Sequence, residues 1–184
     1  KTFIVPDSIE GWARALDVLL SSYFVGGGVH QEYEGHKVFF DLQEIRPKGS
    51  YISGGFKAPG SEPLRIALDK IEQLLNSALK NKMDVLRPID VYDITMYSAD
   101  AVISGGVRRA ATICMFSLED KLMMKAKTGN WFVENPQRAR SNNSVVLYRD
   151  TVSYQELNSI IASIKEYGEP GFVFSDDLNT VFNP

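Results

Sequence analysis

Ser144-Val145-Val146-Leu147-Tyr148 is a short, largely apolar run of the kind that forms a buried strand. Ser153 and Glu156 match a capping box at the start of a helix, and Gly168 is placed to end that helix. A second short strand is predicted from Gly171 to Ser175. Two strands joined through a helix need a crossover connection and pair in parallel. This stretch therefore predicts a parallel α/β sheet.

The same rhythm extends toward the N-terminus. We predict further strands over Lys37 to Leu42 and over Ala110 to Phe116, each following an amphipathic helix. Ser61 and Asp90 are expected to cap two of the other helices, and Ser117 with Asp120 to cap one over 118–127. The fold class is thus α/β with mainly parallel strands and crossover helices. No linker divides the chain, so residues 1–184 are predicted to form one piece without an internal boundary.

Composition excludes several classes of protein. The chain has 184 residues, of which 44% are hydrophobic and 23% charged, a balance typical of globular domains rather than disordered tails. Its net charge of -3 provides no overall basic field for nucleic acid or an anionic membrane. No apolar run reaches the roughly 20 residues of a membrane helix. A single cysteine, Cys114, excludes an internal disulfide and is expected to be a buried apolar side chain.

A glycine-rich loop after the strand at 37–42 is the first candidate for ligand binding. Its basic and glycine residues are Arg46, Lys48, Gly49, Gly54 and Gly55. Glycines let backbone N–H groups turn toward a ligand, and the two bases supply charge-assisted donors to phosphate. The alternative is an ordinary surface loop with solvated bases.

Two further polar segments precede strands. The first contains Ser104, Gly105, Gly106, Arg108 and Arg109, in which glycines permit close approach and arginines can hold a phosphate or stack on a base. The alternative is a helix C-cap followed by a basic strand edge.

The second polar segment contains Ser141, Asn142 and Asn143, whose side chains could hydrogen-bond a sugar or an amide edge, although such residues also simply form turns. No Ser-His-Asp arrangement or metal-ligand cluster is predicted, and His30 and His36 are expected at the surface.

Several short motifs occur in a fixed order along nearly the whole chain. They are Val5-Pro6-Asp7-Ser8 with Glu10-Gly11-Trp12, Ile45-Arg46-Pro47-Lys48-Gly49 with Gly54-Gly55, Ser104 to Arg109, Ala126 to Trp131, Ser141-Asn142-Asn143-Ser144, and Gly168 to Phe172. In this order they resemble the ribonucleotide reductase catalytic subunit, closest to its adenosylcobalamin-dependent (class II) branch. The terminal Asn183-Pro184 resembles the start of that family's Asn-Pro-Cys finger loop.

The resemblance implies a section of a ten-stranded α/β barrel and a role in making DNA precursors. The complete enzyme would reduce ribonucleoside di- or triphosphates to 2'-deoxyribonucleotides through a thiyl radical generated with adenosylcobalamin. Implied partners are the ribonucleotide, a dNTP effector and an external thiol reductant such as thioredoxin, with no nucleic acid and no membrane. The implied location is the cytoplasm.

The resemblance also assigns roles to residues. Ile45 to Gly55 corresponds to the first specificity loop, which places Arg46 at the effector phosphates, and Ser104 to Arg109 corresponds to the second. Ser53 stands where the related iron-dependent branch has a second arginine. Asn183 matches the active-site asparagine. The resemblance further implies a radical cysteine in the finger loop, a carboxylate two residues past it and a redox pair of cysteines that reduces the substrate. All of these lie outside this chain, so the isolated piece is expected to be inactive.

Two other functions stay open at this point. The first is a class I large subunit, in which a separate metal-containing protein delivers the radical. The second is a non-catalytic nucleotide-binding module. The phosphorylation state of the substrate and the oligomeric state, a homodimer included, are not indicated by the sequence.

We expect Arg108→Ala in the intact enzyme to loosen discrimination between substrate bases more than it lowers the maximal rate, because a flexible loop beside the effector would transmit base preference. Steady-state rates for each substrate with each effector measure this. Base selectivity that is unchanged across effectors contradicts it.

Overall fold

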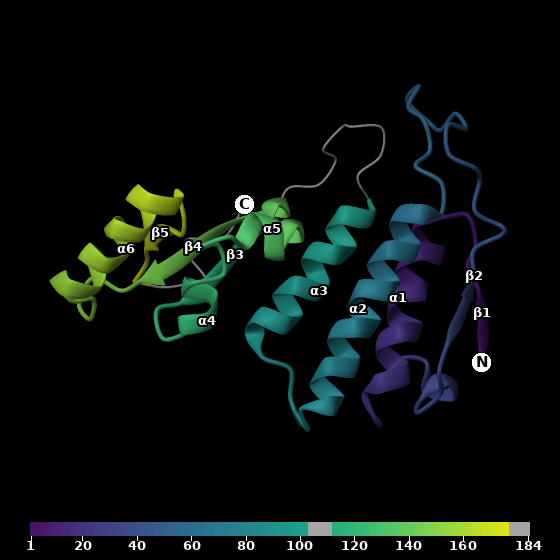
Figure 1. The fold of residues 1–184 in the computed structure, drawn as a ribbon, viewed down its shortest axis with the longest axis horizontal. Coiled ribbons are helices and arrows are strands. Elements are labelled where there is room, and N and C mark those ends of the chain that lie inside the picture. The colour runs from purple at the N-terminus through teal and green to yellow at the C-terminus, as the bar shows by residue number, and fades with distance from the viewer. Residues whose placement is uncertain (103–111, 177–184) are drawn as a thin grey trace. The chain divides into compact units, whose positions relative to one another are not determined.

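The computed structural model describes residues 1–102 and 112–176, which form two compact units. The first unit comprises Lys1–Leu86 and the described part of Tyr97–Ala110, and the second comprises Arg87–Met96 and the described part of Ala111–Pro184. The elements are β1 (Thr2–Ile4), α1 (Ile9–Tyr23), η1 (Gln31–Tyr33), β2 (Phe39–Asp41), α2 (Glu62–Lys80), α3 (Pro88–Ala101), β3 (Thr112–Ser117), α4 (Lys121–Met124), α5 (Trp131–Glu134), η2 (Pro136–Arg140), β4 (Ser141–Leu147), α6 (Tyr154–Tyr167) and β5 (Gly171–Phe174) (Figure 1). Among the described helices, none has the length and apolar character needed to cross a bilayer.

The first unit is a short parallel sheet covered by helices. β1 pairs with β2 in parallel, with Thr2 opposite Phe39 and Ile4 opposite Asp41, and α1 is the crossover between them. α1 begins where the Ser8 hydroxyl accepts a hydrogen bond from the Gly11 backbone N–H at 2.9 Å. α1 and α2 run side by side (Figure 1), because an apolar stripe on each faces the other.

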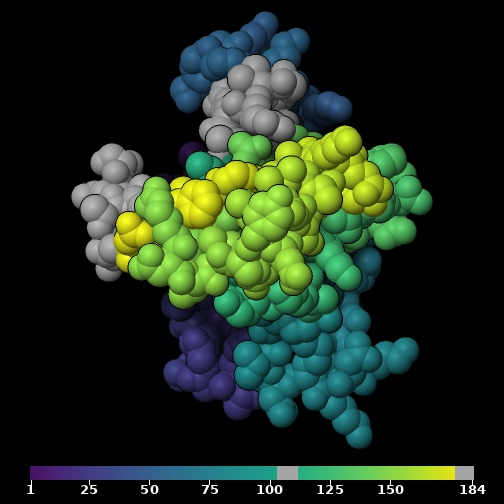
Figure 2. Space-filling model, turned by 90° about the vertical axis from the view of Figure 1, so that its left-hand side faces the viewer, coloured from purple at the N-terminus to yellow at the C-terminus, as the bar shows by residue number. Residues whose placement is uncertain are grey.

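The second unit contains a three-stranded parallel sheet in the order β3-β4-β5. The crossover α6 packs on one face through Ile160, which contacts a core that includes Phe116, Val145 and Leu147. Figure 2 shows the side chains of α6 at the surface of this unit. Ser153 and Glu156 form the capping box of α6, and Gly168 ends the helix in the left-handed conformation.

The predicted α/β class with parallel strands and crossover helices is confirmed, and the differences are local. The strand predicted as buried over 37–42 spans only 39–41, and Phe39 is 61% exposed while Val38 is buried, because successive residues face opposite sides. β1 was not predicted, since three residues carry too little pattern. The helix predicted over 118–127 is reduced to α4, capped by Asp120, whose carboxylate accepts from two backbone N–H groups.

β4 begins three residues earlier than predicted. Pairing of Ser141 with Thr112 and of Asn143 with Cys114 draws the polar segment into the sheet, so tertiary pairing overrides the turn preference of Ser and Asn. The prediction of one piece without an internal boundary stays a prediction.

Asp90 lies inside the first turn of α3 rather than at the predicted capping position. Its Oδ2 accepts hydrogen bonds from the Arg87 backbone N–H at 3.0 Å and from Arg87 Nε at 2.8 Å. The hydrogen bonds from the Arg87 side chain are the main cause that lowers the pKa of the Asp90 carboxyl. The carboxylate thus closes the start of α3 in place of a capping residue before it.

We expect Asp90→Ala to lower the free energy of unfolding by about 0.5–2 kcal/mol at neutral pH. Because the folded-state pKa is depressed, this contribution is complete above the unfolded-state pKa of roughly 3.9 and is lost as pH falls through the folded-state value. Chemical denaturation across this range should show the difference from wild type shrinking on acidification. Asp90→Asn, which retains an acceptor but cannot ionise, is the matched control. A difference that persists undiminished at pH 2 contradicts the assignment.

Candidate functional site

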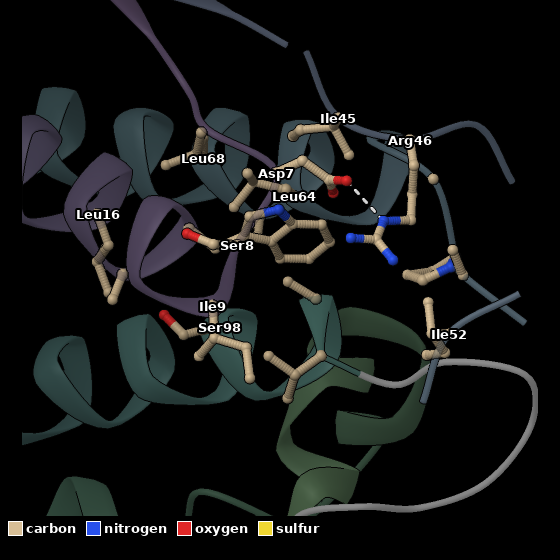
Figure 3. Close-up of a pocket in the computed structure, with 18 of the residues that line it drawn as sticks. Asp7, Ser8, Ile9, Leu16, Ile45, Arg46, Ile52, Leu64, Leu68 and Ser98 are labelled. Carbon is tan, nitrogen blue, oxygen red and sulfur yellow. Dashed lines mark hydrogen bonds and ion pairs between the residues drawn. The ribbon is translucent and has the colours of Figure 1, made fainter. Parts of the chain in front are cut away.

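A pocket of about 650 Å³ opens in the first unit between α1, α2, the end of α3 and the loop after β2 (Figure 3). Its size falls within the range of small-molecule sites. The lining residues are Asp7, Ser8, Ile9, Trp12, Ala13, Leu16, Ile45, Arg46, Ile52, Ser53, Ala58, Pro59, Gly60, Leu64, Ala67, Leu68, Ile71, Ser98, Ala101 and Val102. Most are apolar, and the charged pair Asp7 and Arg46 stands among them.

Parallel pairing of β1 and β2 brings Asp7 and Arg46 together. The pairing continues one residue past β1, where the Val5 N–H donates to the Asp41 carbonyl at 2.9 Å. The two chains then leave the sheet at the same edge, with Asp7 on one and Arg46 on the other. Arg46 Nε donates to Asp7 Oδ2 at 2.6 Å (Figure 3). The side chains are 43% and 30% exposed, so water screens the pair and its contribution to stability is small.

Gly11 fixes the turn that presents Asp7. A Cβ atom on Gly11 would lie 2.3 Å from the Pro6 carbonyl oxygen, a separation that only glycine avoids. This close approach allows the chain to enter α1 directly after Pro6 while Ser8 caps the helix. The motif Glu10-Gly11-Trp12 therefore sets the position of the acidic residue at the pocket.

The pocket is polar at one end and apolar at the other. Figure 3 shows Arg46 and Leu16 far apart, with Ser8 between them. Trp12 stands one helical turn after Ser8 and one before Leu16, so all three share a face of α1. The opposite wall is formed by α2 residues of low exposure, namely Leu64, Ala67, Leu68 and Ile71. Such a cavity suits a ligand with an anionic group near Arg46 and an apolar group deeper inside.

Of the basic and glycine residues predicted in the first loop, the structure brings only Arg46 to this pocket, where Ile45, Ile52 and Ser53 of the same loop also line the wall. Residues 49–58 form a hairpin, in which the Gly49 N–H donates to the Ala58 carbonyl at 2.9 Å, and the hairpin extends past the ends of α1 and α2 (Figure 1). Gly54 and Gly55, with φ of +81° and +77°, form its tip, where residues with a side chain would be strained. Lys48 is exposed. Among the described residues, neither it nor the glycines at 49, 54 and 55 line the pocket.

The second predicted loop and the finger loop cannot be placed. Ser104, Gly105, Gly106, Arg108, Arg109 and Asn183 all lie outside the described residues. Val102, which lines the pocket, is the last described residue before that second segment.

Ser141 and Asn143 belong to a buried network in the second unit. The Tyr92 hydroxyl lies 2.7 Å from Ser141 Oγ and donates to Asn143 Oδ1 at 3.1 Å. Burial is the main cause that raises the pKa of Tyr92, so the phenol stays neutral and keeps its proton for these bonds. Cys114 shares this side of the sheet and is half-buried, and burial raises the pKa of its thiol.

Asn142 points to the opposite side. Because residues alternate along a strand, it lies on the face away from α6 with Ser144, beside Ile113 and Met115 of β3, which are 67% and 40% exposed. The three predicted polar residues are therefore divided. Ser141 and Asn143 hold the interior together, and Asn142 alone is exposed for contact with a ligand.

Lys127 anchors the start of β4. Its ammonium donates to the Ser141 carbonyl and to Glu169 Oε1 at 2.8 Å, and it lies 5.4 Å from the centre of the Trp131 ring. Glu169 Oε2 accepts from the Asn143 N–H at 3.3 Å. The side chains of Lys127 and Glu169 are 5% and 20% exposed, so the charges satisfy each other inside the unit. Within the ranges 1–102 and 112–176, no cluster of three or more His, Cys, Asp or Glu residues could hold a metal ion.

Sequence reasoning missed Asp7, Ser8 and Trp12 as pocket residues. In the local sequence, Asp7 and Ser8 fit the capping positions of a helix and Trp12 fits its apolar face, so nothing nearby indicates a role in a pocket. The one signal present is the short apolar run just before Pro6, which overlaps β1 but is too short to predict a strand by itself. With that strand recognised, Asp7 becomes a residue at a strand end, where ligands bind in this class of fold.

The comparisons with known proteins agree on one enzyme. The chain is 33% identical over 181 residues to a probable adenosylcobalamin-dependent ribonucleoside-triphosphate reductase of Dictyostelium discoideum, covering 96% of the chain and 22% of that protein. Adenosylcobalamin-dependent ribonucleoside-triphosphate reductases from Lactobacillus delbrueckii subsp. bulgaricus and Lactobacillus leichmannii are 34% and 33% identical to it over 173 residues. Each of these two matches covers 94% of this chain and 22% of the reductase.

This chain is similar to a section of the adenosylcobalamin-dependent ribonucleotide reductases. The resemblance predicted from its motifs is confirmed. The chain spans about a fifth of the length of these reductases. No family model matches it.

We expect Lys127→Met to lower the free energy of unfolding by about 3–5 kcal/mol, because it leaves the partly buried Glu169 carboxylate without its cation. Adding Glu169→Gln should recover part of the loss, a coupling that a double-mutant cycle measured by chemical denaturation would report. The control Asn142→Ala, on the exposed side of the same strand, should change stability by less than about 0.5 kcal/mol. Strictly additive losses at 127 and 169 would show that the two charges do not interact.

Proposed function

We propose that the complete protein carrying this chain reduces ribonucleoside triphosphates to 2'-deoxyribonucleotides with adenosylcobalamin, and that this chain supplies part of its α/β barrel. The similarity of 94–96% of the chain to enzymes of that name supports the proposal. The parallel strands and crossover helices are consistent with such a section. A class I large subunit is not favoured, because the relatives given above are all named as adenosylcobalamin-dependent, and neither is a non-catalytic module.

We propose further that the pocket between α1 and α2 binds the nucleotide effector. The observation that carries this is Arg46, which stands at the rim of a mostly apolar pocket of about 650 Å³. Only its Nε is engaged, by Asp7, and its two Nη groups make no hydrogen bond to another described residue. Those groups would bind phosphate, while the ribose would lie beside Asp7 and Ser8.

We propose roles in the same reaction for residues outside this pocket. Asn142 is the residue of β4 whose exposed side chain would reach the ribonucleotide, whereas Ser141 and Asn143 would position it from the buried side. We also propose that Lys48 and the glycines of the hairpin, with Ser104 to Arg109, form the specificity loops and that Asn183 contacts the substrate ribose. An external thiol such as thioredoxin would supply the electrons in the cytoplasm.

The described residues do not fit adenosylcobalamin. Two pockets among them measure about 650 and 310 Å³, the size of sites for small ligands, and a corrin with its two nucleoside arms is much larger.

We expect Arg46→Ala to weaken dNTP binding roughly 10- to 100-fold, the loss typical of one hydrogen-bonded charge. Isothermal titration calorimetry on the complete protein measures it. Arg65→Ala is the matched control, because Arg65 lies on the exposed side of α2 and pairs with Glu62 and Asp69 outside the pocket. Unaltered dNTP affinity in Arg46→Ala contradicts the effector site. Absence of adenosylcobalamin-dependent reduction of any ribonucleoside triphosphate contradicts the activity.

A further inference from the structure

Trp12 is the largest side chain in the wall of the pocket between α1 and α2. It is part-buried, and its indole N–H makes no hydrogen bond to another described residue. A tryptophan in a pocket usually finds a partner for this donor, since an apolar wall alone could be built from leucine. Trp12 therefore offers a flat ring and a spare donor to whatever enters the pocket.

The position of Trp12 relative to Arg46 gives the pocket a direction. Asp7 pairs with the guanidinium, Ser8 follows Asp7 in the chain, and Trp12 follows Ser8 by four residues, which is one turn or about 5.4 Å farther along α1. Leu16, one more turn on, ends this row, and Leu64 and Leu68 of α2 form the opposite wall. An anionic group held by Arg46 would thus project the rest of its molecule along the face of Trp12.

We infer that Trp12 is the base-reading platform of this site, on which the aromatic base of a nucleotide stacks while its phosphates bind Arg46. The inference rests on the proposed effector site and names the part of the ligand that the apolar half of the pocket accepts. A ring sandwiched between the indole and the leucines of α2 gains stacking and apolar burial. The free indole N–H can donate to an acceptor on the edge of the base or on the ribose.

The alternative is that Trp12 only fills space in the wall. In that case its loss would disturb the pocket as a whole, and every ligand would bind less tightly. Stacking predicts a selective effect, because inorganic tripolyphosphate carries the charge of the nucleotide but has no base.

The test compares dGTP, dTTP and inorganic tripolyphosphate as ligands of the complete protein by isothermal titration calorimetry. We expect Trp12→Leu to bind the two nucleotides roughly 5- to 100-fold more weakly, with tripolyphosphate affinity unchanged. Trp12→Phe, which keeps an aromatic face, should retain most of the nucleotide affinity. Trp131→Leu makes the same substitution in the second unit and should leave all three ligands unaffected.

Three results would overturn the inference. They are wild-type nucleotide affinity in Trp12→Leu, an equal loss in Trp12→Leu and Trp12→Phe, and a loss that tripolyphosphate shares. If wild type binds dGTP and Arg46→Ala does not, but Trp12→Leu behaves as wild type, the effector site stands and only the role of Trp12 fails. If wild type binds none of the ligands, the proposed effector site fails together with the inference.

Discussion

Parallel pairing is the constraint on which the rest of this structure depends. The chain leaves two parallel strands at the same edge of the sheet. Residues that follow the two strands therefore lie close together there even when they are distant in sequence. In the first unit this edge joins Asp7 to Arg46 at 2.6 Å, although 39 positions separate them. The apolar stripes of α1 and α2, which exist to bury one another, then leave a cavity beside that pair. The site is thus a consequence of the parallel pairing of β1 and β2 through the crossover helix α1.

The fold class could be predicted from the sequence because its strongest signals are local. The capping box of Ser153 with Glu156 and the terminating Gly168 define α6 at both ends, and the structure has both features. β1 and the early start of β4 could not be predicted. Three residues carry no measurable periodicity, and Asn142 with Asn143 favours turns until a neighbouring strand offers hydrogen bonds.

The candidate site was predicted in outline only. The charge of Arg46 and the glycines around it indicated a phosphate ligand, but not which residues of the loop face a cavity. That depends on how the hairpin at 49–58 folds, which brings Ile52 and Ser53 to the pocket but not the glycines at 49, 54 and 55. Asp7, the acidic partner of Arg46, could not be recognised from the sequence, because Asp7-Ser8 is also a typical start of a helix. A residue that both caps a helix and contacts a residue far away in the sequence shows only its capping role in the sequence pattern.

The alternation along β4 limits how this segment can change. Ser141 and Asn143 form hydrogen bonds with Tyr92 on one side of the sheet, while Asn142 lies on the other side. Neighbouring residues of one motif are therefore constrained by different surroundings. Inserting or deleting one residue ahead of Asn142 would exchange the two sides, turning the exposed amide into the interior and the hydroxyl and the second amide outward. The segment can therefore accept substitutions at single positions, whereas an insertion or deletion would disrupt the packing on both faces of the sheet.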